Sequence, residues 1–263
     1  MSFDLKAVNF SLEKTLFSGQ CFRFEVLNDC KFLIFSGKDF AVVQQVGEIL
    51  KFENSTCNEN FWSKYFDLNF DYGKILQGFV GDVVLESAVS FCGRLHILNQ
   101  DPFETLISFL LSSNNNIVRI KKIVSILCER FGEKFQWGFA FPEIESLKNC
   151  TLNDLSVLKA GYRTKYIYDA ICKINSKEVD LEKLWFLNVD DARKNLMKIK
   201  GVGVKVANCV LLFAYHKFEV FPVDVWIKRV ISMYYKLGLS KQVLSCPGFA
   251  QQLLYYSKRE GVI

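Results

Sequence analysis

The sequence predicts an α+β protein in which an N-terminal twisted antiparallel sheet precedes a C-terminal bundle of helices. Up to about residue 58, short stretches of β-branched and aromatic residues alternate with turn residues, whereas beyond about residue 96 the apolar residues recur every three or four positions. The chain has 263 residues, of which 50% are apolar, enough for one large core or two modest ones. We therefore expect two parts, residues 1–95 and residues 96–263.

The first part contains four expected strands, FRFEVL, KFLIFSG, FAVVQQV and EILKFE. Turn residues separate them at Asn28-Asp29, Gly37-Lys38 and Gly47. The alternation in KFLIF and FAVVQQV is typical of an antiparallel sheet.

The second part contains a series of helical segments. DPFETLISFLLS begins with Asp101 as a cap and Pro102 in the first turn, and IVRIKKIVSILCERFG ends at Gly132. The remaining segments are TLNDLSVL, with a polar cap at Thr151, then TKYIYDAICKI, DDARKNLMKI, VKVANCVLLFAY, VDVWIKRVISMYYKLG and GFAQQLLYYSK.

The composition argues against several classes of protein. The nine cysteines are scattered singly without a C-x-x-C pair, which argues against a disulfide framework and against a zinc or iron–sulfur site. The presence of only two histidines argues against histidine-based metal catalysis. No apolar run approaches the roughly 20 residues that span a bilayer, and the N-terminus does not resemble a targeting segment. We expect a soluble cytoplasmic protein with no membrane partner, and its net charge of +5 is compatible with a polyanion.

The stretch NLMKIKGVGVKVANCV has the form helix, glycine turn, helix over about residues 191–215. It matches neither a dinucleotide fingerprint nor a Walker loop. Gly201, Val202 and Gly203 can expose consecutive backbone N–H groups at the start of the second helix, a site for one DNA phosphate. Alternatively, the glycines serve only to permit a tight turn, and an isolated GVG does not decide between the two.

Two charged residues follow this turn at a defined spacing. Lys205 begins the second helix, and Asp224 comes 19 positions later, after Pro222. Taken separately, Lys205 is typical of a lysine whose amine reaches the surface, and Asp224 is typical of a helix N-cap. Together with the glycine turn they form a much more specific pattern.

With these residues the chain resembles the helix-hairpin-helix, Gly/Pro-Asp superfamily of DNA glycosylases, and within it the 8-oxoguanine DNA glycosylase/AP lyases. Further similar stretches occur in the same order along nearly the whole chain: SGQCFRF (18–24), QDPFETLISFLLSSNNNIVRI (100–120), GYRTKYI (161–167) and GFAQQLLYY (248–256). The resemblance implies a monomeric base excision repair enzyme without a cofactor, associated with the nucleoid. It would excise 8-oxoguanine opposite cytosine from duplex DNA, through a lysine Schiff base and β-elimination.

The resemblance also implies a role for each matching residue. Lys205 would attack C1′ of the sugar, and Asp224 would stabilise the sugar cation. The residues that would bind the lesion base are Gly19, through its carbonyl, Gln251 on the pairing edge, and Cys209 and Tyr255 on the two faces. Cys209 follows Lys205 by four positions and therefore shares its helical face, which supports the assignment independently of the family.

A second group would act on the DNA around the extruded nucleotide. Asn114 would fill the gap in the helix, Arg119 and Arg163 would bind the orphaned cytosine, and Tyr162 would be the wedge. Catalysis requires no metal, but the resemblance allows a structural cation at the backbone carbonyls of Met197, Ile199 and Val202.

The chain departs from the family pattern at two positions. Trp226 stands where vertebrate members carry a phosphate-binding histidine, and Tyr255 stands where phenylalanine is familiar. One rival interpretation is a glycosylase of the same fold for a different lesion, although endonuclease III-like members carry four clustered cysteines where this chain has only Cys246. Another is a non-catalytic helix-hairpin-helix protein that only binds DNA.

Overall fold

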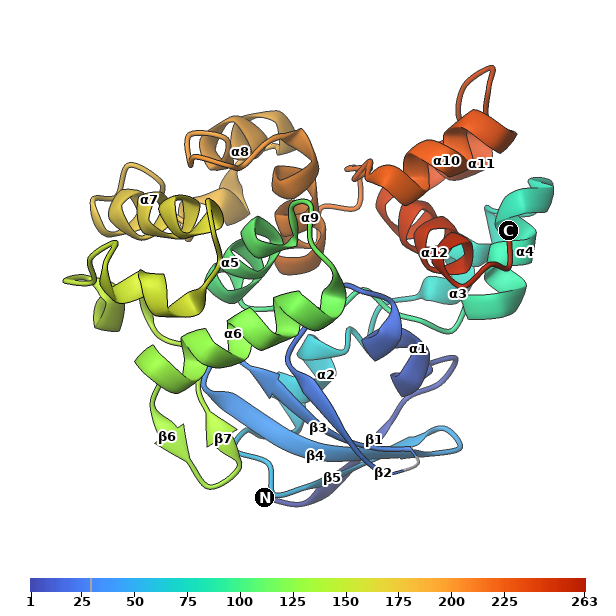
Figure 1. Ribbon diagram of the computed structural model, residues 1–263. Helices are drawn as coiled ribbons and strands as arrows, with labels where there is room; N and C mark the ends of the chain where they lie inside the picture. Colours follow the sequence, from blue (N-terminus) through green and yellow to red (C-terminus); the bar gives the residue numbers. More distant parts are fainter. Residues whose placement is uncertain (29) are drawn as a thin grey trace.

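The computed structural model describes residues 1–28 and 30–263, and it contains the predicted sheet followed by helices (Figure 1). Five strands form one antiparallel sheet in the order β1-β5-β4-β3-β2. They are β1 (Phe3–Lys6), β2 (Phe24–Asn28), β3 (Lys31–Ser36), β4 (Asp39–Val46) and β5 (Ile49–Glu53). The four predicted strands are confirmed and β1 is added, while Asp29 of the predicted turn lies outside the described residues.

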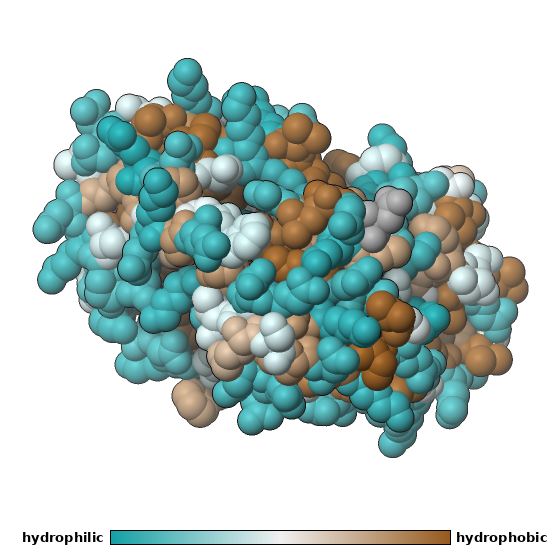
Figure 2. Space-filling model, turned by 90° about the horizontal axis from the view of Figure 1, so that it is seen from below, coloured by the Kyte–Doolittle hydropathy of each residue, from teal (hydrophilic) through white to brown (hydrophobic). Residues whose placement is uncertain are grey.

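Both faces of the central strands are covered. Ile34 of β3 packs with Trp62 of α2 (Glu59–Tyr65) in a core that α1 (Leu12–Phe17) also joins. On the other face, Leu33 packs with Phe135 of a small hairpin, β6 (Lys134–Phe135) and β7 (Gly138–Phe139). Seen from this end of the molecule, the surface is mostly hydrophilic, with hydrophobic side chains in separate groups (Figure 2).

The predicted helices form with one exception. Asp101 accepts a hydrogen bond from Glu104 N at 2.7 Å at the start of the first, and Gly132 follows the end of the second. They are α5 (Pro102–Ser112), α6 (Ile117–Phe131), α7 (Arg163–Asn175), α8 (Val189–Leu196), α9 (Val204–Tyr215), α10 (Val225–Tyr234) and α12 (Pro247–Arg259). Further short helices are α11 (Lys241–Ser245), η1 (Ile144–Leu147) and η3 (Lys183–Phe186).

The exception is TLNDLSVL, which is helical as expected but is not an α-helix. The segment forms a 3₁₀ helix, η2 (Asp154–Leu158). Thr151 and Asp154 bond to each other in a tight turn before it, and Lys159 ends it in the left-handed conformation, with φ at 49°. Because a turn begins at each end, the helix is limited to the residues Asp154–Leu158.

Two helices of the first predicted part, α3 (Tyr72–Gln77) and α4 (Val83–Cys92), pack with the helical bundle rather than with the sheet. Leu85 of α4 lies in the same core as Phe249 of α12, and α4 packs along α12. The division of the chain into parts at residue 95 therefore stays a prediction from the sequence.

A buried ion pair joins the sheet part to α5. Arg23 Nη1 and Glu104 Oε2 are 2.9 Å apart, and their side chains are only 7% and 10% exposed. Gly37 N also donates to Glu104 Oε2 at 2.8 Å, and Arg23 donates to the Phe139 carbonyl at 2.8 Å. These bonds fix the segment before β2 against the helices. Within the described residues, no helix combines the length and the apolar character that crossing a bilayer requires.

Candidate active site

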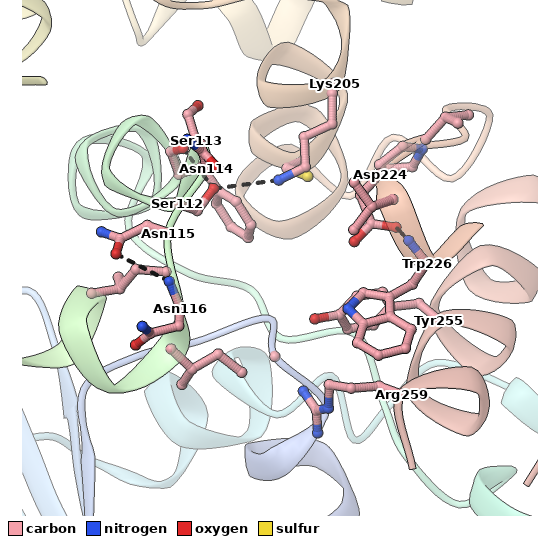
Figure 3. Close-up of a pocket in the computed structure, with 18 of the residues that line it drawn as sticks. Ser112, Ser113, Asn114, Asn115, Asn116, Lys205, Asp224, Trp226, Tyr255 and Arg259 are labelled. Carbon is pink, nitrogen blue, oxygen red and sulfur yellow. Dashed lines mark hydrogen bonds between the residues drawn. The ribbon is translucent and has the colours of Figure 1, made fainter. Parts of the chain in front are cut away.

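A cavity of about 780 Å³ opens where five parts of the chain meet. These parts are the segment before β2, the loop between α5 and α6, the first turns of α9 and α10, and one face of α12. Figure 3 shows side chains from facing walls of this cavity. The candidate residues that line it are Gly19, Asn114, Lys205, Cys209, Asp224, Gln251 and Tyr255.

The hairpin of α8 and α9 is braced on both sides of its turn. Arg193 of α8 donates from Nε to Asn208 Oδ1 of α9 at 2.8 Å. The backbone N–H of Lys200 donates to Asp169 of α7 at 2.8 Å. The turn is therefore fixed relative to both neighbouring helices.

The two glycines of this turn are required for different reasons. Gly201 has φ at +86°, and a Cβ atom there would overlap the ring of Tyr166, so no other residue fits. Gly203 is the N-cap of α9, where a Cβ would meet nothing within 4 Å, and it offers no side-chain bond to the first amides of the helix. Those amides are available to an anion.

Val202 is already engaged inside the turn, because its N–H donates to the Ile199 carbonyl at 3.1 Å. Of the predicted phosphate-binding residues, it is thus the least able to offer its amide. The Ile199 carbonyl keeps its second lone pair, so the predicted cation site at Met197, Ile199 and Val202 is chemically compatible and stays a prediction. In the described part of the chain, no group of three or more His, Cys, Asp or Glu residues is placed so that it could hold a metal ion.

Lys205 projects from the first turn of α9 into the cavity (Figure 3). Its Nζ donates to Ser112 Oγ at 3.3 Å and lies 5.2 Å from the centroid of the Phe109 ring. Both contacts come from α5, which packs along α9. The amine is therefore half-buried and directed by a hydroxyl and an aromatic face.

Asp224 faces Lys205 from the start of α10 (Figure 3). Its Oδ1 accepts hydrogen bonds from the N–H groups of Trp226 and Ile227, both at 2.9 Å. The carboxylate is thus held as the N-cap that the sequence predicts. Lys205 and Asp224 line the same cavity, and the hydrogen bond of the Lys205 amine goes to Ser112 rather than to Asp224.

Cys209 lies one turn after Lys205 on the inward side of α9 and is 4% exposed. Burial raises the pKa of its thiol, and Lys205 only partly offsets this effect. The side chain is therefore a neutral thiol at neutral pH, suited to contact with a flat ring.

Gln251 and Tyr255 project from successive turns of α12. Gln251 is 4% exposed, and its Oε1 is buried without a hydrogen-bond partner among the described residues. A buried amide oxygen without a partner costs free energy unless a ligand or water completes its bonding. Gln251 therefore leaves an acceptor in the cavity wall without a partner among the described residues.

Gly19 lies in a segment that buried amide side chains hold in place. Gln252 Nε2 donates to the Ser18 carbonyl at 2.8 Å, and Gln100 Nε2 donates to the Gln20 carbonyl at 2.8 Å. Gly19 itself has φ at +82°. Within the described residues, no donor bonds to the Gly19 carbonyl, so this acceptor is available.

The four residues predicted to act on the DNA helix lie outside the deep cavity or at its edge. Asn114 lines the edge with φ at 50°, and Arg119 lies exposed on α6. Tyr162 is 50% exposed. Arg163 differs from expectation, since it is 4% exposed and donates to the carbonyls of Ser113 at 2.9 Å and Asn114 at 2.7 Å. In this arrangement it holds the loop that carries Asn114.

Comparison with known families covers almost the whole chain. Residues 2–106 match the family model described as 8-oxoguanine DNA glycosylase, N-terminal domain. Residues 107–243 match the HhH-GPD superfamily of base excision DNA repair proteins. The chain belongs to the 8-oxoguanine DNA glycosylase family.

Relatives of this family occur in distant organisms. The chain is 37% identical over 166 residues to an N-glycosylase/DNA lyase of Saccharomyces cerevisiae, covering 57% of this chain and 44% of the relative. It is 31% identical over 191 residues to a probable N-glycosylase/DNA lyase of Methanothermobacter thermautotrophicus, covering 64% of this chain and 61% of the relative. The match thus spans less than two thirds of the length of either relative.

A solved structure matches over its full length. The 8-oxoguanine glycosylase/lyase of Clostridium acetobutylicum, in complex with duplex DNA containing cytosine opposite 8-oxoguanine, is 35% identical, with a TM-score of 0.91. The match covers 100% of this chain and 99% of that one. The α+β architecture of the 8-oxoguanine DNA glycosylase family is therefore confirmed for this chain.

Three residues of this glycosylase-family site were not singled out from the sequence. Phe109 and Ser112 contact the amine of Lys205, and Arg259 lines the cavity beside Tyr255. A signal for Arg259 was present, because it follows Tyr255 by four positions and shares its helical face. Trp226, the departure from the family's histidine, also lines the cavity and lies 4.9 Å from the guanidinium carbon of Arg229.

Proposed function

We propose that this protein is a bifunctional DNA glycosylase/AP lyase that removes 8-oxoguanine from duplex DNA in base excision repair. One observation carries the proposal: Lys205 and Asp224 face each other in a cavity whose wall also contains Gly19 and Gln251. The amide oxygen of Gln251 and the carbonyl of Gly19 have no donor among the residues that the structure describes. A nucleophile, a carboxylate and a base-recognition wall are thus in one space. A protein that only binds DNA has no need of such a cavity.

The reaction follows from the chemistry of these groups. The neutral amine of Lys205 attacks C1′ of the deoxyribose, the bond from C1′ to N9 breaks, and the base leaves with the bonding electrons and takes up a proton. Asp224 stabilises the positive charge that develops on the sugar. The nitrogen, now bonded to C1′, loses a proton, and the bond from C1′ to the ring oxygen O4′ breaks with O4′ taking up a proton, which opens the sugar and leaves a Schiff base. Loss of a C2′ proton then breaks the bond from C3′ to O3′ and expels the 3′ phosphate, which nicks the strand.

The cavity wall supplies base recognition. 8-Oxoguanine carries a proton on N7 where guanine carries a lone pair, so the carbonyl of Gly19 would accept from the lesion and repel guanine. Gln251 can both donate to and accept from the pairing edge. Cys209 and Tyr255 would cover the two faces of the ring. One such polar contact is worth about 1–3 kcal/mol, so discrimination requires several together.

Cytosine is the proposed opposite base. Arg119 has an exposed side chain next to the loop of Asn114, and its fork of donors matches the two acceptors on the pairing edge of cytosine. Arg163 can join it only by giving up its bonds to the carbonyls of Ser113 and Asn114. Arg119 is therefore expected to contribute more to the choice of opposite base, with Tyr162 as the wedge.

We further propose that one chain acts alone on duplex DNA, in the cytoplasm with the nucleoid. All candidate residues that line the cavity come from this chain, so the site needs no second copy. Light scattering of the protein with and without a lesion duplex tests this, and a dimer in both samples would contradict it.

Borohydride trapping tests the central claim. The wild-type protein is incubated with duplexes that contain 8-oxoguanine opposite each of the four bases, and covalent adducts and strand nicks are counted. Lys205→Gln should bind the cytosine duplex but form neither adduct nor nick. Lys194→Gln is the matched control, because it removes the same charge from a side chain on α8 that is 79% exposed.

The outcomes separate the rival interpretations. If the wild type forms no adduct with any of the four duplexes, the proposed activity is wrong. If Lys205→Gln lowers duplex affinity and changes nothing else, the protein is a DNA-binding module. Trapping on other lesions but not on 8-oxoguanine would indicate a different specificity on the same fold.

A further inference from the structure

Arg259 is a charged residue in the wall of the proposed lesion pocket. It has no role in the reaction proposed above. It lies in the last turn of α12, four residues after Tyr255, and its side chain is 16% exposed. Figure 3 shows it below Tyr255, on the side of the cavity away from Lys205. It is therefore too far from the amine to share in the attack on the sugar, but it borders the space for the base.

The guanidinium of Arg259 is fixed by two of its three nitrogens. Nη2 donates to the carbonyl of Phe17, and Nε donates to the carboxylate of Glu260 at 3.0 Å. The third nitrogen, Nη1, is buried without a hydrogen-bond partner among the described residues. Buried donors nearly always have partners, and a cationic donor without one is especially costly. This arrangement therefore indicates that Nη1 is held ready for an acceptor.

Nη1 points to the part of the pocket formed by Gly19. A Cβ atom at Gly19 would lie 2.9 Å from Arg259 Nη1 and 3.1 Å from the hydroxyl of Tyr255. The donor therefore lies beside the residue whose carbonyl is assigned to the N7 proton. The residue before Gly19 is held in place, because Gln252 Nε2 donates a hydrogen bond to the carbonyl of Ser18.

We propose that Arg259 is a base-contacting specificity residue, whose Nη1 donates to O6 or O8 of the extruded 8-oxoguanine. This inference rests on the proposed function. In the lesion, N7–H lies between the two carbonyl oxygens O6 and O8. When N7–H donates to the Gly19 carbonyl, one of these oxygens therefore comes next to Nη1 of Arg259 and can accept from it. Arginine suits this task because its planar group stays charged and rigid when two of its nitrogens are already bound.

The first test separates a base contact from a contact to the DNA backbone. Arg259→Met has a similar length and cannot donate, and the neighbouring Lys258→Met is the control, since Lys258 bonds to the Ile263 carbonyl and does not line the cavity. We expect Arg259→Met to excise 8-oxoguanine about 10- to 100-fold more slowly in single turnover, the effect of one charged hydrogen bond. Nicking of an abasic duplex, which has no base to contact, should be unchanged.

The second test identifies the acceptor atom. Analogues of 8-oxoguanine with sulfur at position 8 or at position 6 replace one oxygen at a time by a weaker acceptor. In the wild type, replacing the contacted oxygen slows excision, and in Arg259→Met the same replacement should have little additional effect. The position at which the two changes are not additive is the one that Arg259 binds.

Several outcomes overturn the inference. Equal loss of abasic-site nicking would indicate a phosphate contact or a damaged fold, and full additivity with both analogues would show that Arg259 touches neither oxygen. Thermal melting and Arg259→Lys, which keeps a charged donor and should retain part of the rate, separate a folding defect from a lost contact. A wild type that does not excise 8-oxoguanine would instead contradict the proposed function.

Discussion

Gly201 lies directly against the ring of Tyr166, so the turn between α8 and α9 rests on the side of α7. Tyr166 also contacts Tyr162 edge to face, with 5.6 Å between the ring centroids. One aromatic side chain thus connects the proposed phosphate-binding turn to the proposed wedge. A disturbance of the turn is expected to reach both.

The two glycines of this turn should respond differently to alanine. Gly201→Ala must adopt an unfavourable φ and displace Tyr166, so it should lower the free energy of unfolding by about 2–4 kcal/mol. Gly203→Ala meets no neighbour within 4 Å and has an ordinary φ of −94°, so it should change stability by less than about 1 kcal/mol. Urea unfolding measures both, and equal losses would contradict the packing described above.

Asp224 combines a capping role with the proposed catalytic role, and two substitutions separate them. Asp224→Asn keeps the cap, since asparagine caps as well as aspartate, so its melting temperature should be nearly that of the wild type. Its excision rate should fall at least about 100-fold, because the negative charge facing the sugar is lost. Asp224→Ala should lose the rate and, in addition, about 1 kcal/mol of stability. Excision by Asp224→Asn at the wild-type rate would exclude the electrostatic role.

Arg119 is expected to control the choice of opposite base. Arg119→Ala should reduce the ratio of excision opposite cytosine to excision opposite adenine by about 10- to 100-fold, the worth of one bidentate base contact. Arg130→Ala, an exposed arginine near the other end of α6, should leave the ratio unchanged. Single-turnover rates on the two duplexes decide, and a wild type that shows no preference would refute the assignment.

Replacing one residue of the buried pair of Arg23 and Glu104 should destabilise the protein more than replacing both. Arg23→Met leaves the carboxylate of Glu104 buried without its cation and should destabilise the protein by about 3–5 kcal/mol. The double variant Arg23→Met/Glu104→Gln removes the charge as well and should recover part of that loss. Denaturant unfolding of Arg23→Met, of Glu104→Gln and of the double variant tests this. If the two single losses simply add in the double variant, the pair is not coupled.

His96 should make stability fall in mild acid. Burial lowers the pKa of His96 from 6.5 to about 4, so the unfolded chain binds a proton there below pH 6.5 while the folded chain does not until about pH 4. The free energy of unfolding is therefore unaffected by His96 well above pH 6.5 and falls as the pH drops below that value. At pH 5 the loss due to His96 is about 2 kcal/mol. His96→Gln, which keeps an amide donor for the Phe66 carbonyl, should lose about 2 kcal/mol less than the wild type between pH 7.5 and pH 5. An equal loss in both proteins would assign the acid sensitivity to other groups.

The predictability of the fold varied with the length of the signal. Long amphipathic segments with a clear cap, such as the one after Asp101, gave helices at the expected residues, because the cap and the apolar spacing agree. Helices α1 to α4 were not predicted, since they are short and their type depends on packing against the sheet or α12. The 3₁₀ helix after Thr151 shows the same limit, because a local side-chain turn decided its form.

The candidate site was predictable where a residue belongs to a motif and not where only the tertiary structure defines its role. Lys205, Asp224, Gln251 and Gly19 were found by pattern and meet in one cavity. Nothing in the spacing of the sequence indicated that Ser112 would accept a hydrogen bond from the amine of Lys205, since α5 and α9 are far apart in the chain. Nor could the sequence reveal that Arg163 is committed to the Ser113 carbonyl, because that contact depends on how a loop folds back.

The hydrogen bond from Gln252 to the Ser18 carbonyl joins residues that are 234 positions apart. During synthesis, the segment around Gly19 therefore leaves the ribosome long before the helix that completes its pocket. The proposed phosphate-binding hairpin can fold earlier, from neighbouring residues, whereas the proposed base-binding wall depends on docking of α12 against α4. If the proposed function holds, a nascent chain would have its proposed DNA-binding hairpin before its proposed lesion pocket, which is complete only after α12 has been synthesised.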